Sequence, residues 1–175
     1  MAKNIVICCD GTGNEHSESN TNVGYFFEAL DRDNANQAVF YDAGVGTFSP
    51  FGWRLGKWVG QKLGAAFGFG VKKNIEDAYR FLMDHYSDGD SVFILGFSRG
   101  AFTARSLASM LNICGLLYRD HHNLVCYASQ KYFGKAHPDE IAEFKRVFCR
   151  PCHPHFLGVW DTVASLGAIL SLRQF

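Results

Sequence analysis

Residues 91–107 read SVFILGFSRGAFTARSL, and this stretch decides the fold class. Its first part, 91–97, is an almost wholly apolar run, which predicts a strand buried on both faces. A helical pattern follows over 99–112, and Gly96-Phe97-Ser98-Arg99-Gly100 matches G-x-S-x-G at the junction. The alternative is an ordinary glycine turn with an incidental serine. The strand and helix on either side favour a nucleophile elbow, a strained turn that presents the Ser98 hydroxyl above the sheet.

Apolar runs and helical patterns alternate on both sides of this stretch. Further buried strands are expected over 3–9, 37–41 and 155–160. Further helices are expected over 20–30, 71–86, 121–133 and 137–149, with Asn20 or Thr21 capping the first. Apolar strands separated by helices predict an α/β fold, with a mostly parallel sheet and helices on both faces. We expect one such domain over residues 1–175.

Composition excludes several classes of protein. Of the 175 residues, 47% are hydrophobic and 19% charged, which is not the composition of a disordered segment. The 17 Lys+Arg residues balance the 17 Asp+Glu residues, and no basic stripe is present, so nucleic acid is not an expected partner. With no signal peptide or membrane-spanning run, the sequence predicts cytoplasmic synthesis. Export by a signal-independent route stays open.

The loop after the first strand is the expected second half of an oxyanion hole. Asp10-Gly11-Thr12-Gly13-Asn14 leaves the carboxyl edge of the sheet, where open α/β sheets bind their ligands. We expect the N–H groups of Gly11 or Thr12, with that of Arg99, to face a developing oxyanion, and Asp10 to position the loop. A plain turn, or a metal or phosphate loop built on Asp10, is the alternative.

Four motifs occur in order: CDGTGN at 9–14, YDAGVGT at 41–47, GFSRGAFTAR at 96–105 and GVWDTV at 158–163. Together they resemble the α/β-hydrolase domain of the type VI secretion lipase effectors of the first family. The resemblance extends from residue 3 to about residue 167. It implies a serine esterase with a lipid ester, such as a phospholipid, as substrate, with Ser98 as nucleophile and Asp161 as the acid of the triad. Asp161 also follows a strand, where a carboxylate can orient an imidazole; a helix cap or turn acid is the alternative.

The general base is not evident. In this fold the triad runs serine, acid, histidine, and no histidine follows Asp161. The last residues resemble an element cut short, which favours an incomplete domain or a base borrowed from elsewhere. His16, in the loop after the first strand, is the candidate substitute base. The alternative function is a catalytically incomplete fragment or an interaction module.

Two further patterns have weaker functional interpretations. Cys149-Arg150-Pro151-Cys152-His153 matches C-x-x-C-H, but a haem or zinc site lacks its context, so we expect no metal and no cofactor. Glycines recur at every fourth position over 52–68, between tryptophans and basic residues. This segment is either a lid or membrane-surface element, or a loop and short helix packed on the sheet.

Overall fold

The computed structural model describes residues 2–11, 20–44, 58–134 and 136–162, and the side chains of helix α2 from residue 70 onward. Thr12, His16 and most of the glycine-rich segment 52–68 therefore lie outside the described backbone or side chains.

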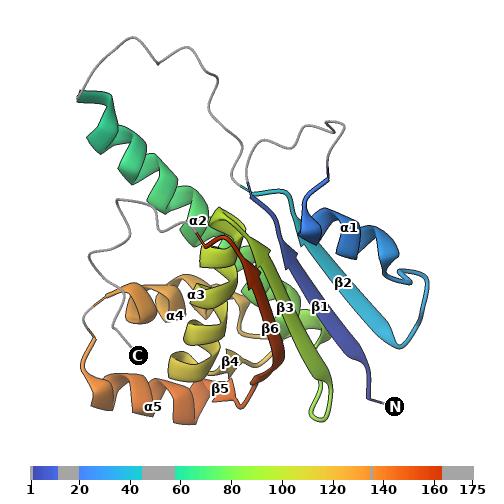
Figure 1. Cartoon of the computed structure of the whole chain (residues 1–175). Coiled ribbons are helices and arrows are strands. Elements are labelled where there is room, and N and C mark those ends of the chain that lie inside the picture. The colour runs from blue at the N-terminus through green and yellow to red at the C-terminus, as the bar shows by residue number, and fades with distance from the viewer. Residues whose placement is uncertain (1, 12–19, 45–57, 135, 163–175) are drawn as a thin grey trace.

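Four parallel strands form the central sheet (Figure 1). They are β1 (Asn4–Cys9), β2 (Gln37–Asp42), β3 (Ser91–Phe97) and β6 (Pro154–Trp160), in the order β2-β1-β3-β6. All three ladders are parallel, so the carboxyl ends of the strands meet at one edge. The α/β fold expected from the sequence is confirmed.

Helices cover both faces of the sheet because side chains of β1 alternate between them. Val6 and Cys8 pack in one cluster with Val23 of α1 (Asn22–Ala29). Ile5 and Ile7 pack in a larger cluster with α2 (Trp58–His85) and α3 (Arg99–Cys114). Helix α2 begins 13 residues before the range 71–86 that the periodicity indicated.

A second layer of helices packs beside α3. A 3-10 turn at His122–Leu124 leads into α4 (Val125–Phe133), and α5 (Pro138–Phe148) follows with His137 as its N-cap. The sequence did not indicate the small antiparallel sheet of β4 (Leu116–Leu117) and β5 (Cys149–Arg150). Tyr79 of α2 supports this sheet, since its hydroxyl donates to Gly115 O (2.7 Å) and accepts from Leu117 N (2.9 Å).

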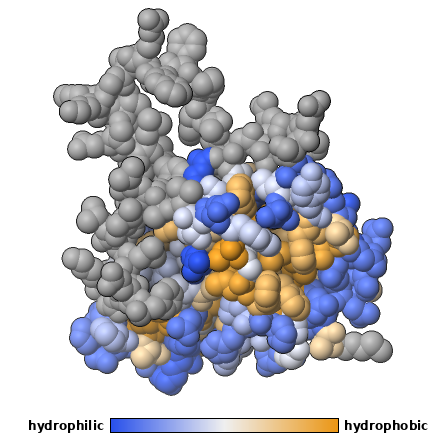
Figure 2. Space-filling model, viewed as in Figure 1, coloured by the Kyte–Doolittle hydropathy of each residue, from blue (hydrophilic) through white to orange (hydrophobic). Residues whose placement is uncertain are grey.

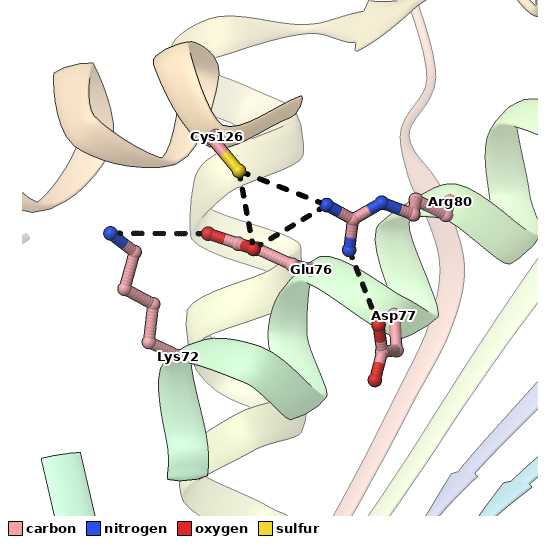
Figure 3. Close-up of polar contacts among 5 residues, drawn as sticks. All are labelled: Lys72, Glu76, Asp77, Arg80 and Cys126. Atoms are coloured by element: carbon pink, nitrogen blue, oxygen red, sulfur yellow. Dashed lines mark hydrogen bonds and ion pairs between the residues drawn. The ribbon is translucent and has the colours of Figure 1, made fainter. Parts of the chain in front are cut away.

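A charged cluster on α2 faces α4 (Figure 3). Glu76, only 9% exposed, lies 3.5 Å from the Arg80 guanidinium and 3.9 Å from Lys72 Nζ. The Sγ atom of Cys126 on α4 lies 3.9 Å from both Glu76 and Arg80. The partly buried carboxylate is thus compensated by two cations of its own helix, at the surface where α4 packs.

Strand β6 differs from its expectation as a buried strand. It is an edge strand of the described sheet, with a register irregularity where it pairs with Val92 and Phe93. Phe156 is 52% and Leu157 38% exposed, although neighbouring side chains on a strand point to opposite faces. Figure 2 shows apolar side chains gathered over β6 and its neighbour β3. An apolar run therefore predicted the strand correctly but not its place at the edge.

Candidate active site

Ser98 lies at the junction of β3 and α3 in a backbone conformation that L-residues rarely adopt. Its φ is 55° and its ψ is −116°, and its side chain makes no capping bond to α3. Thr21, an ordinary N-cap, has φ −73° and ψ 166°, and its hydroxyl accepts from Gly24 N. Ser98 therefore begins a helix without acting as its cap. Strain of this kind is found at functional sites, where surrounding structure maintains it.

The two glycines of the elbow are required by close backbone packing. A Cβ on Gly96 would lie 2.5 Å from Gly100 O and 2.6 Å from Ala101 Cα. A Cβ on Gly100 would meet the carbonyl group of Cys9, and would lie 2.6 Å from Asp10 O. The elbow is therefore pressed against the end of β1 and the loop that follows it, as the G-x-S-x-G geometry requires.

The loop after β1 also contacts Ser98 and Phe97 of the elbow. A Cβ on Gly11 would lie 3.3 Å from the Cβ of Ser98 and 3.2 Å from the ring of Phe97. The loop after β2 contacts the loop after β1, because a Cβ on Gly44 (φ 83°) would lie 2.8 Å from Asp10 O and 2.9 Å from Gly11 O. The loop after β1 thus lies between the elbow and the loop after β2.

Asp10 is a buried residue whose side chain fixes the start of the loop after β1 through hydrogen bonds. It is 2% exposed, and its Oδ1 accepts from Gly11 N (2.7 Å). Its Oδ2 accepts from the hydroxyls of Thr21 and Tyr41, each at 2.8 Å. With both oxygens satisfied by protein donors, a positioning role suits this carboxylate better than a metal or phosphate site. The Gly11 N–H is already engaged, and Thr12 lies outside the described residues.

Asp161 lies beside Ser98 at the same edge. Phe97 pairs with Trp160, and Ser98 N donates to Trp160 O at 2.9 Å, so Ser98 and Asp161 follow paired residues of neighbouring strands. Asp161 is exposed and has a positive φ of 45°. Next to it, Thr162 Oγ1 accepts from Arg105 Nε of α3 at 3.2 Å. This bond joins the motif that contains the serine to the motif that contains the acid.

Arg99 occupies the first position of α3 directly after the serine. Its side chain is partly buried, and burial lowers the pKa of its guanidinium. The backbone N–H of the residue after a nucleophile stands at the positive end of the helix dipole, where an oxyanion is stabilised.

Histidines of the described residues make their contacts away from the elbow. His85 ends α2 just before β3, and its ring stacks on Phe81. His122 Nε2 lies 2.8 Å from Asp84 in that same last turn of α2, and His155 packs against Phe93 in the first half of β3. His121, His137 and His153 complete this set: His121 lies against Phe148, and His137 caps α5. His16 lies outside the described residues, so its candidacy is untested.

The cysteines near the C-x-x-C-H pattern are buried thiols. Burial raises the pKa of Cys149 and of Cys152 to about 12, so both stay protonated at neutral pH. Among the residues that the structure describes, no group of three or more His, Cys, Asp or Glu side chains could hold a metal ion. The thiols thus fit a packing role, because a thiolate is the form that attacks or binds a metal.

Thr21 and Tyr41 were not identified as site residues from the sequence. Tyr41 begins the second motif, YDAGVGT, but only the sheet register brings its hydroxyl to Asp10. Thr21 was recognised as a helix cap, and its bond to Asp10 spans 11 positions of sequence. A polar residue at the end of the neighbouring strand was the available signal.

Comparisons with known proteins show the family of the chain. Residues 3–175 match the model of the type VI secretion system phospholipase effector, Tle1-like, catalytic domain. An uncharacterized protein of Saccharomyces cerevisiae is 34% identical over 193 residues, covering 99% of this chain and 28% of the yeast protein. The chain thus spans little more than a quarter of that relative. No solved structure matches the chain. In the described part of the chain, no helix is long and apolar enough to cross a membrane.

Proposed function

Because the chain belongs to the Tle1-like phospholipase effector catalytic domain family, we propose that it is a serine ester hydrolase acting on phospholipid or another lipid ester. The observation that carries this proposal is the strained backbone of Ser98, whose side chain makes no capping bond to α3. Ser98 also lies between Gly96 and Gly100, where any larger residue would clash with neighbouring backbone. An ordinary turn has no need of this conformation, whereas a nucleophile elbow does.

The chemistry would proceed through an acyl-enzyme. Ser98 Oγ attacks the ester carbonyl carbon while its proton passes to the general base, and the carbonyl oxygen becomes an oxyanion. The N–H of Arg99 and a second N–H from the loop after β1, for which Thr12 is the candidate because the Gly11 N–H is bound to Asp10, would stabilise that charge. Collapse of the intermediate breaks the ester bond, and the base returns the proton to the leaving alcohol. Water then attacks the acyl-enzyme by the same route and releases the fatty acid.

Asp161 is the proposed acid of the triad. Its position beside Ser98 at the carboxyl edge supports this role, since the acid must reach the far side of an imidazole that contacts the serine. The base itself is a histidine not yet identified. His16 is the candidate within the chain, because the loop that holds it begins at Gly11, beside the serine.

Lipid is the proposed substrate class, supported by the family and by the apolar surface over β3 and β6 (Figure 2). We propose no nucleic-acid partner and no cofactor. Contact of segment 52–68 with a membrane surface remains a hypothesis, because it rests on side chains outside the described set. Unchanged fluorescence of Trp53 and Trp58 on addition of anionic vesicles would contradict it.

The test is labelling of the full chain with a fluorophosphonate probe, together with hydrolysis of phospholipid vesicles. Ser98→Ala should abolish labelling, and Asp161→Asn should slow it by about 10⁴-fold, because the base loses its orienting charge. Ser87→Ala and Asp88→Asn are matched controls, since both residues are exposed in the turn before β3. Folding is checked by circular dichroism.

A specific observation favours a second candidate. Five of the six described histidines, His85, His121, His122, His137 and His155, make contacts outside the loops around Ser98. If a folded wild-type chain gives neither labelling nor hydrolysis, the chain as it stands is a catalytically incomplete module that keeps the elbow without its base. Labelling that survives in Ser98→Ala would contradict the assignment of the nucleophile.

A further inference from the structure

We infer that Thr21 and Tyr41 are positioning residues of the hydrolase site, because their hydroxyls hold Asp10 and thereby fix the loop beside Ser98. This inference rests on the proposed function and adds two residues to its site. Asp10, Thr21 and Tyr41 are called the loop clamp below.

The clamp consists of short bonds to one buried carboxylate. Asp10 Oδ2 accepts from Thr21 Oγ1 and from the Tyr41 hydroxyl, both at 2.8 Å, while Oδ1 accepts from Gly11 N at 2.7 Å. Asp10 is 2% exposed, so water contributes little to its solvation. Bonds to an ionised acceptor are stronger and more directional than neutral ones, and a buried acceptor that loses a donor is costly. The orientation of the carboxylate therefore depends on both hydroxyls.

Both donors come from rigid elements of the fold. Thr21 is the N-cap of α1, where its oxygen also accepts from Gly24 N at 3.0 Å. Tyr41 lies in β2, and its ring packs on Phe27 of α1 with centroids 4.6 Å apart. A helix and a strand thus reach the same oxygen from different directions, which defines its position better than a donor on a loop would.

The clamp acts on the nucleophile through Gly11. The Gly11 N–H donates to Asp10 Oδ1. Gly11 is also close to the nucleophile, since a Cβ added to it would lie 3.3 Å from the Cβ of Ser98. The backbone of Gly44 also lies close to the start of this loop, since an added Cβ there would be 2.8 Å from Asp10 O and 2.9 Å from Gly11 O. Displacement of the loop would move any oxyanion donor that it carries relative to Ser98. Reactions that depend on aligned groups are sensitive to shifts well below 1 Å.

A purely structural role predicts a different outcome, and Tyr79 provides the comparison. Its hydroxyl also makes two short bonds, to Gly115 O and Leu117 N, but these support the β4–β5 sheet at the opposite end of the central sheet (Figure 1). Tyr41→Phe and Tyr79→Phe each remove one hydrogen-bonded hydroxyl, on a partly buried side chain at Tyr41 and a fully buried one at Tyr79. Only Tyr41→Phe releases the loop beside Ser98.

The experiment compares rates of fluorophosphonate labelling and the melting temperatures of full-length variants. Tyr41→Phe should lower the second-order labelling constant by about tenfold, whereas Tyr79→Phe lowers the melting temperature without that loss. Thr21→Val should act like Tyr41→Phe, and Thr21→Ser, which keeps the hydroxyl, should restore most of the rate. Amide hydrogen exchange of Gly11 is measured by NMR in the same variants, with about tenfold faster exchange expected in Tyr41→Phe.

The outcomes separate this inference from the proposed function. If Tyr41→Phe and Thr21→Val are labelled as fast as the wild type, the inference about the loop clamp is overturned and the proposed hydrolase function stands. Absence of labelling in the wild type overturns the hydrolase. In that case the exchange of Gly11 decides the clamp: faster exchange in Tyr41→Phe alone supports it, and unchanged exchange contradicts it.

Discussion

Gly100 has no room for a side chain, because a Cβ at this position would clash with the backbone of Cys9 and Asp10. Gly100→Ala should therefore destabilise the chain by about 3 kcal/mol, because the elbow and the loop after β1 would have to separate. Gly24→Ala is the control: its Cβ would make ordinary contacts at 3.5 Å, and alanine favours a helix, so stability should rise slightly. Denaturant unfolding measures both. Equal stability of Gly100→Ala and wild type would show that the contact can relax.

The residues of the site differ in how far the sequence could predict them. Ser98, Gly96 and Gly100 follow from local pattern, because the strain of the elbow has a fixed spacing of glycines. The function of Asp10 stayed open between a turn, a metal loop and a positioning residue, since its hydrogen-bond donors are 11 and 31 positions away. Long-range partners of this kind are determined by sheet register and helix packing, which local patterns do not encode.

Among the elements, the start of β3 depends on one acid in the turn before it. Asp90 accepts from Lys3 N (2.9 Å) and Ser87 N (2.8 Å), and lies 3.0 Å from Lys3 Nζ. Although its burial alone would raise the pKa of Asp90, these bonds and the Lys3 charge hold it below the usual value. The carboxylate thus joins the turn before β3 to the residues that lead into β1.

Asp90→Asn should therefore cost about 2 kcal/mol at pH 7, because an amide replaces a charged acceptor of several bonds. The folded pKa is lowered, so this stabilisation is complete above the unfolded value of about 3.9 and is lost as pH falls through the folded value. Urea unfolding from pH 7 to pH 2.5 measures it, with exposed Asp88→Asn as control. A difference between variant and wild type that stayed constant down to pH 2.5 would contradict the ionic origin.

Element lengths explain which parts of the fold the sequence predicted. The strands of the central sheet were found because apolar runs of six or seven residues are distinctive. Strands β4 and β5 contain two residues each and carry no periodicity. The start of α2 was missed because glycines recur through its first turns, and glycine disfavours a helix by about 1 kcal/mol relative to alanine.

At the scale of the whole molecule, the position of β6 at an edge of the described sheet is the largest departure from the sequence expectation. The pattern of 155–160 is that of an interior strand, yet the side chains of Phe156 and Leu157 are exposed to solvent. A long apolar edge offers unpaired backbone groups and side chains to a second chain. This surface, over β6 and β3, is the one that Figure 2 shows as apolar.

We therefore expect the isolated 175-residue chain to self-associate as its concentration rises, through the β6 edge. Phe156→Lys should shift the equilibrium toward monomer, because a charge on an edge strand opposes pairing while its own side chain stays in water. Tyr25→Lys on α1 is the matched control, since Tyr25 is similarly exposed, at 57% against 52% for Phe156, but belongs to a helix and not to the edge strand. Sedimentation velocity from micromolar to near-millimolar concentration measures the association. If Phe156→Lys and Tyr25→Lys reduce it equally, general hydrophobicity and not the edge strand drives it, and a wild type that stays monomeric throughout contradicts association altogether.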